Sequence, residues 1–150
     1  MNLLLKVQSA LATHIRAAGT SIPNIYKAFE HAADDLDNPA SARIQLPCVI
    51  CDTTDADESL PESGNFRVSC TVIVRSQIDD STDAQHESRC AEIAALLMVS
   101  DLAASLTAAI PAFTCQYFYP GIRSTDELRD RHWESALTFD LDCCASDLSA

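Results

Sequence analysis

The stretch that decides the fold class is FRVSCTVIVRSQI, residues 66–78, near the middle of the chain. Every second position is apolar, and most positions between them are polar or charged. This alternation is typical of a β-strand with one face in the core and the other partly in solvent. The apolar set is Phe66, Val68, Cys70, Val72 and Val74, and the other set is Arg67, Ser69, Thr71, Ile73 and Arg75.

Three more segments show the same period of two, so we expect about four strands. They span residues 44–50, 112–119 and 133–143. Their alternating apolar positions are Ile44, Leu46, Cys48 and Ile50, then Phe113, Cys115, Tyr117 and Tyr119, and finally Trp133, Leu137, Phe139, Leu141 and Cys143.

Helical spacing separates these strands. A first helix is expected over residues 3–18, with Gly19 as its C-terminal cap. Thr82 and Gln85 form a capping box that opens a second helix, and Ser100 or Asp101 starts a third piece before Pro111. Residues 25–36 also have helical spacing. The apolar helical positions are Leu4, Val7, Leu11 and Ile15; Ile25, Phe29, Ala32 and Leu36; Cys90, Ile93 and Leu97; and Leu102, Leu106 and Ile110.

The order of these elements predicts an α+β fold. We expect a mostly antiparallel sheet of about four strands, with amphipathic helices packed on one face. The chain has 150 residues and an apolar fraction of 47%, which suit one domain spanning residues 1–150. Two polar segments are expected to be long exposed loops. Residues 52–65 contain five acids and no base, and residues 119–131 carry mixed charges.

The charge balance argues against phosphate-rich partners. Ten basic residues stand against 22 acidic ones, which gives a formal charge of −12, and the bases are scattered singly. Nucleic-acid surfaces need clustered Lys and Arg, so direct binding to DNA or to an anionic membrane is disfavoured. The surplus of acid suits solubility, or a surface that must not adhere to nucleic acid. No secretory signal and no apolar run of about 20 residues is visible, so we expect a cytosolic chain.

Cys48 and Cys51 form a C-x-x-C pattern, which is also found in zinc and redox sites. A structural zinc ion needs a second pair of ligands, and the adjacent Cys143 and Cys144 would point to opposite faces of a strand. A redox pair would stand at the start of a helix, whereas this pair lies in a predicted strand. We therefore expect buried thiols that act as small apolar side chains, and neither metal nor cofactor.

Catalytic motifs are absent from the sequence. We find no nucleophile elbow, no H-E-x-x-H, no phosphate-binding loop and no dinucleotide-binding glycine pattern. The four histidines are isolated from one another, and His14 and His86 are expected at surface or boundary positions of helices. We therefore expect no catalytic residues and no enzymatic activity.

In the order of its elements, the chain resembles the tail-terminator (tail-completion) proteins of long-tailed bacteriophages, which are related to the neck proteins of the head–tail junction. The resemblance covers nearly the whole length. It comprises the first helix, a strand entered through Leu46-Pro47, a long loop, the strand 66–78 and a helix from Thr82. Two terminal strands around a polar loop follow, and the last opens just after an Arg-rich turn. The family pattern has a shorter extended segment where residues 25–36 show helical spacing.

The resemblance implies a structural virion protein. Such proteins form a hexameric ring that caps the tail tube, ends its polymerisation and joins it to the head connector. The implied partners are further copies of the chain, the tail tube protein, connector or neck proteins, and a sheath protein if the tail is contractile. Assembly would take place in the host cytoplasm, and DNA would pass through the ring without specific binding.

A closed ring needs a heterologous interface, and loops on a rigid sheet can reach the next subunit. We assign this interface to residues 52–65 and 119–131. The mixed charges of the second segment suit pairing between subunits, and they would suit a solvated turn equally well. The candidate interface residues are Asp55, Asp57, Glu58, Arg123, Asp126, Glu127, Arg129 and Arg131. Two alternatives stay open: another neck, head-closure or baseplate adaptor, and a small cytosolic metal or thiol module that uses Cys48 and Cys51.

Overall fold

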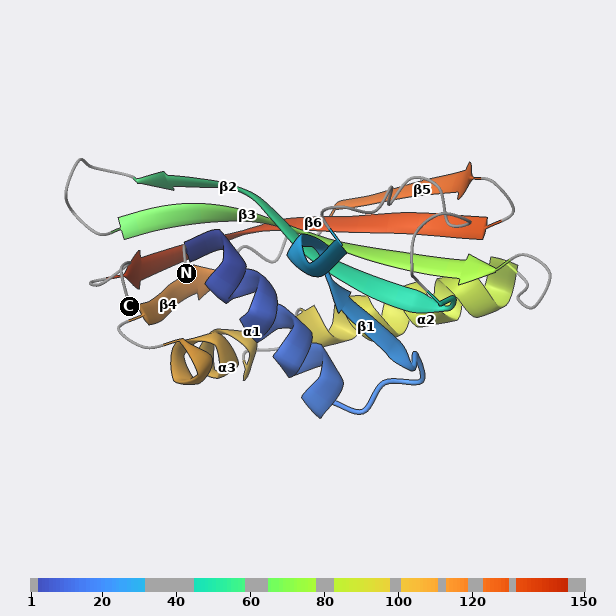
Figure 1. The fold of residues 1–150 in the computed structure, drawn as a ribbon, viewed down its shortest axis with the longest axis horizontal. Helices are drawn as coiled ribbons and strands as arrows, with labels where there is room; N and C mark the ends of the chain where they lie inside the picture. The colour runs from blue at the N-terminus through green and yellow to red at the C-terminus, as the bar shows by residue number, and fades with distance from the viewer. Residues whose placement is uncertain are drawn as a thin grey trace.

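The computed structural model describes residues 3–31, 45–58, 65–77, 83–97, 101–110, 113–118, 123–129 and 132–145 (Figure 1). No helix in these ranges is both long enough and apolar enough to cross a bilayer. The elements, in chain order, are α1 (Leu3–Ala17), β1 (Asn24–Lys27), the 3₁₀ helix η1 (Ala28–His31), β2 (Cys48–Glu58), β3 (Asn65–Gln77), α2 (Asp83–Leu97), α3 (Asp101–Ala109), β4 (Phe113–Phe118), β5 (Arg123–Arg129) and β6 (His132–Ala145).

The six strands form one mixed sheet. Its order is β1-β2-β3-β6-β4, and β5 also pairs with β6. β1 runs parallel to β2, and the other pairs are antiparallel. The long strand β6 holds β3 along one side, and along its other side it holds β5 at residues 132–138 and β4 at residues 141–145. The predicted α+β class with a mostly antiparallel sheet is confirmed.

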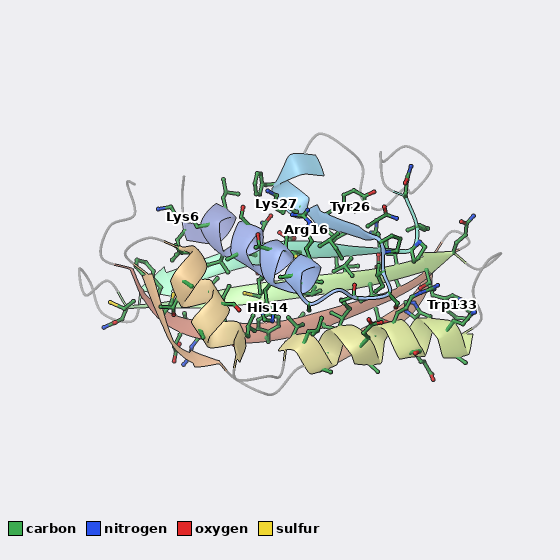
Figure 2. The ribbon with its side chains drawn as sticks, turned by 90° about the horizontal axis from the view of Figure 1, so that it is seen from below. Lys6, His14, Arg16, Tyr26, Lys27 and Trp133 are labelled. Atoms are coloured by element: carbon green, nitrogen blue, oxygen red, sulfur yellow. The ribbon has the colours of Figure 1, made fainter. Side chains whose placement is uncertain are left out.

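The core lies between this sheet and the helices, which cover one of its faces (Figures 1 and 2). The alternation of apolar residues also predicted which face of β3 lies in the core. Val68, Cys70, Val72 and Val74 on that face are at most 1% exposed. Burying a valine side chain contributes about 1.5–3 kcal/mol, so this layer adds to the stability of the fold. The helices add Val7, Leu11, Ile15, Ile93, Leu97, Leu102 and Leu106, and β6 adds Leu137, Phe139, Leu141 and Cys143.

The face of the sheet turned away from the helices changes character along its length. At the start of β2, Cys48 and Ile50 are fully buried on this face, beside the buried ion pair of Arg75 and Glu134. Toward the far end of β2 the face is polar, and there Arg67 on β3 pairs with Asp142 on β6. The strand predicted from residue 44 is therefore buried on both faces at residues 48–51 rather than on one.

The ends of the helices agree with their sequence signals. Gly19 has a positive φ of 69°, and its backbone N–H donates to Arg16 O at 3.2 Å. Gly19 therefore ends α1 as the C-terminal cap that the sequence predicted. α2 and α3 coincide with the two helical pieces expected before Pro111. Thr82, the expected cap of α2, lies outside the described residues.

Four local expectations are wrong. The sheet has six strands instead of about four. Residues 25–36 have helical spacing, but the described part of this segment lies in the short strand β1 and the 3₁₀ helix η1. The segment therefore starts in an extended conformation, as in the family pattern. Of the two expected loops, residues 52–58 continue β2 and residues 123–129 form β5. Residues 32–44 and 59–64 lie outside the described residues, as do residues 119–122 and 130–131.

Candidate functional site

The first group of predicted interface residues lies on the second half of β2. Asp55 is paired in register with Ser69, Asp57 with Arg67 and Glu58 with Phe66. β1 pairs only with residues 48–51, so among the described strands nothing flanks the outer side of residues 52–58. This acidic segment is therefore an open edge of the sheet, with backbone donors and acceptors along it.

The second group lies on β5, on the opposite side of the sheet. Arg123 is paired in register with Thr138, Glu127 with Glu134 and Arg129 with His132, and Asp126 also lies on this strand. β5 pairs with β6 and with no other described strand, so its outer side is a second open edge. Arg131 lies outside the described residues. The structure does not bring the two groups together within one chain, because β3 and β6 separate them.

The acidic half of β2 is anchored to α1 by a junction of polar side chains. Gln8 is 4% exposed, and its Nε2 donates to Asp52 Oδ1 at 3.2 Å and to Thr53 Oγ1 at 3.1 Å. Its Oε1 accepts from the backbone N–H of Phe29 at 3.2 Å, and Thr53 Oγ1 donates to Leu4 O at 2.9 Å. Burial raises the pKa of Asp52, and the hydrogen bond from the backbone N–H of Thr53 opposes that rise. One glutamine thus fixes α1, β2 and η1 together.

The polar part of the outer sheet face carries more acid than base. Arg67 binds Asp142 through two hydrogen bonds, Nε to Oδ1 at 3.0 Å and Nη2 to Oδ2 at 3.3 Å. Ser69 donates to Asp140 Oδ1 at 3.1 Å. Among the side chains that the structure describes, this area carries two acids and one base: Asp140, Asp142 and Arg67. The area is therefore acidic even with its ion pair formed.

The C-x-x-C pair is not arranged as a metal or redox site. Val49 and Cys51 face the helices, whereas Cys48 faces the other way, so the two thiols lie on opposite faces of the sheet. Both are fully buried, and burial raises the pKa of each to about 12. No group of three His, Cys, Asp or Glu side chains is placed to hold a metal among the described residues. These thiols pack as small apolar side chains, as expected.

His14 and His86 each form hydrogen bonds to other elements of the fold, and the burial of His86 was not expected from the sequence. His14 is partly exposed, as expected, and links α1 to the end of α2 and to α3. Its Nε2 donates to Leu96 O at 3.2 Å, its Nδ1 lies 3.0 Å from Ser105 Oγ, and it lines a shallow cavity of about 310 Å³ between α1 and α3. His86 was expected at the surface or boundary but is 6% exposed, because two serines of the sheet lie opposite it.

Comparison with known proteins gives a match by structure alone. No protein-family model matches the chain, and no curated protein matches its sequence. A chain in the solved structure of the virion of a native gene transfer agent (GTA) particle has the same fold, with a TM-score of 0.60. The match covers 92% of this chain and 94% of that chain, at 12% sequence identity. The two chains therefore share their fold over almost their whole lengths.

Proposed function

We propose that this chain is a structural virion protein that forms a ring, expected to contain six copies, at the head-proximal end of a phage tail tube. The observation that carries the proposal is the end-to-end match in fold to a component of a GTA virion. It agrees with the resemblance to tail-terminator proteins, which depends on the order of the elements in the sequence. In this role the ring stops tube polymerisation and offers a docking face to the head connector, and no catalysis is required.

The ring contact is proposed between the two open edges of neighbouring subunits. A closed ring needs two different patches on each copy, so that the patch of one meets the other patch of the next. The half-strand 52–58 and β5 meet this requirement, since they lie on opposite sides of the sheet. Each also has one side that pairs with no other described strand, and backbone groups on such a side can pair with an added strand.

The charges on these edges fit such a contact. The half-strand carries Asp55, Asp57 and Glu58, and β5 carries Arg123 and Arg129 among its mixed charges. Charges across an interface chiefly set register and partner choice, so these pairs would fix how the two edges align. The acidic outer face would leave passing DNA unbound, because like charges repel.

The proposal is tested by reversing Arg129 and Arg131 to Glu in the virus that encodes the protein. Each reversal changes the charge by two units, so the pair takes the chain from −12 to −16. We expect a folded subunit that no longer assembles, with tails of uncontrolled length or tails that do not join heads. The matched control is Lys6→Glu with Arg16→Glu on α1, which makes the same change of charge on a helix instead of on the two strands of the proposed contact (Figure 2).

The outcomes separate the parts of the proposal. Infectious particles with tails of normal length from the Arg129/Arg131 variant would remove β5 and residues 130–131 from the ring contact. Wild-type virions that lack the protein would overturn the virion role itself. Protein found at a head-closure ring or at the baseplate would favour the alternative adaptor role, which the fold match fits equally.

A further inference from the structure

The strand β2 is irregular at the place where its outer side becomes open. β1 pairs with residues 48–51 only, and the register of β2 on β3 shifts between Thr53 and Asp55. Thr54 is the extra residue of this β-bulge, and it has no counterpart in the register of the two strands. One extra residue bends a strand and increases its twist. The bulge therefore sets the direction of residues 55–58, which belong to the proposed ring contact.

The bulge also decides which positions of β2 face the core. Val49 and Thr53 are buried before it, and the partly buried Ala56 packs against the core after it. Strict alternation from Thr53 would place positions 55 and 57 on the core side. The bulge must therefore stay at Thr54 for the open edge to keep its register.

Gln8 on α1 binds β2 just before the bulge. The side chain is 4% exposed, and its Nε2 donates to Asp52 Oδ1 at 3.2 Å and to Thr53 Oγ1 at 3.1 Å. Thr53 is 6% exposed, and its Oγ1 donates in turn to Leu4 O at 2.9 Å. The last two residues before Thr54 are therefore both bound to one helix.

The hydrogen-bonding groups of the Gln8 amide match this place on β2. Nε2 has two N–H donors and two acceptors on the strand, and Oε1 accepts from the backbone N–H of Phe29 at 3.2 Å. A slip of the strand by one residue would leave these buried groups unpaired, so the network specifies one register. Gln8 thus holds the bulge at Thr54, whereas an apolar side chain would fill the same space without selecting a register.

We propose that Gln8 is a positioning residue that sets the rotation from one subunit of the ring to the next by holding the bulge of β2. This role rests on the proposed ring contact through residues 52–58. Each contact in a closed ring of six copies turns the next subunit by about 60°, and a contact with another turn gives a different ring or an open filament. The direction of residues 55–58 contributes to this turn, so a bulge that is not held gives a range of turns.

Native mass spectrometry and electron microscopy of the purified full chain test this role. Gln8→Met keeps the length of the side chain and removes its donors, and Thr53→Val keeps the shape and removes the hydroxyl. For both variants we expect the share of closed rings with the wild-type copy number to fall severalfold, with other copy numbers or open filaments in their place. Thr71→Val, the same change on β3 opposite Asp52, is the control and should keep the wild-type distribution.

Hydrogen exchange on the same samples follows the bulge itself. In Gln8→Met, amides 54–58 should lose protection relative to the wild type, because the strand is no longer fixed at Thr54. Amides 48–51 should keep their protection, since β1 and β3 flank them on both sides. Thr53→Val provides the same comparison if Gln8→Met fails to fold.

The outcomes separate this role from a merely structural one and from the ring itself. A residue that only stabilises the fold would shift rings toward monomers without changing their copy number, so unchanged copy numbers in both variants would overturn the positioning role. Equal exchange of amides 54–58 in the wild type and both variants would also overturn it. Wild-type chains that form no ring would overturn the proposed function, and the role of Gln8 with it.

Discussion

Arg75 and Glu134 face each other across β3 and β6 as a buried ion pair, with 2.6 Å between Nε and Oε1. The Arg75 side chain is 2% exposed and that of Glu134 is 11% exposed. Arg75 Nη1 is buried without a hydrogen-bond partner. Because such a pair often offsets its own desolvation only partly, we expect it to specify the pairing of the strands more than it stabilises the fold.

Removing one member of this pair should be far more harmful than removing both. Glu134→Ala leaves a buried guanidinium uncompensated, and we expect a loss of ~3–5 kcal/mol in the free energy of unfolding. Arg75→Met combined with Glu134→Leu should recover most of that loss, because no charge stays buried. Urea denaturation of both variants measures the difference. A double variant as unstable as the single one would show that the pair contributes net stability.

Phe139 should be among the costliest core positions to truncate. It is 3% exposed on β6 and lies in one cluster with Ile93 and Leu97 of α2. Phe139→Ala should lower the free energy of unfolding by ~3–5 kcal/mol. Thr138→Ala, one residue away on the other face of the sheet, is the control and should cost less than about 1 kcal/mol. Similar losses for the two variants would contradict the assignment of the faces of β6.

The buried thiols should be unreactive in the folded protein. Because burial raises the pKa of Cys48 and Cys51 to about 12, neither forms a thiolate at pH 9, where an ordinary thiol is half ionised. Alkylation at pH 9 followed by mass spectrometry should modify the partly exposed Cys90 and Cys144 first. Cys48 and Cys51 should react only in denaturant. Rapid modification of either one in the native chain would contradict this packing.

Asp52→Asn should stabilise the protein at neutral pH. Burial raises the pKa of this carboxyl in the folded state, so folding favours its neutral form. That contribution is present below the pKa of the unfolded chain and is lost as pH rises through the folded value. An asparagine Oδ1 can still accept from Gln8 and from the backbone N–H of Thr53. The gain in melting temperature at pH 7 should vanish near pH 3, and a gain that is equal at both pH values would point to another cause.

The sequence predicts the interior of this fold well and its edges poorly. β3 is central, so its two faces differ in solvent exposure and its alternation is regular. β5, with the sequence RSTDELR, has the composition of a turn, and it is extended because it pairs with the backbone of β6. Residues 52–58 extend β2 for the same reason. Backbone pairing does not depend on side-chain polarity, so hydropathy patterns do not detect such strands.

The same limit applies to the candidate sites. The interface residues were selected for their charge. All of them except Arg131, which lies outside the described residues, are on strands that have one side without a described neighbouring strand, where the sequence predicted loops. The burial of His86 depends on Ser76 and Ser135, which lie 10 and 49 residues away in the chain. Nothing in the helical spacing of α2 marks that position.

We propose that copies of this chain close into a ring through the two edges of the sheet. Electron microscopy of the purified protein, with native mass spectrometry of the same sample, tests it most directly. We expect closed rings of six copies around a central channel, which Arg129→Glu with Arg131→Glu converts to monomers while Lys6→Glu with Arg16→Glu leaves them intact. Wild-type protein that stays monomeric at every concentration and salt level, or that forms open filaments in place of rings, would contradict ring closure through these edges.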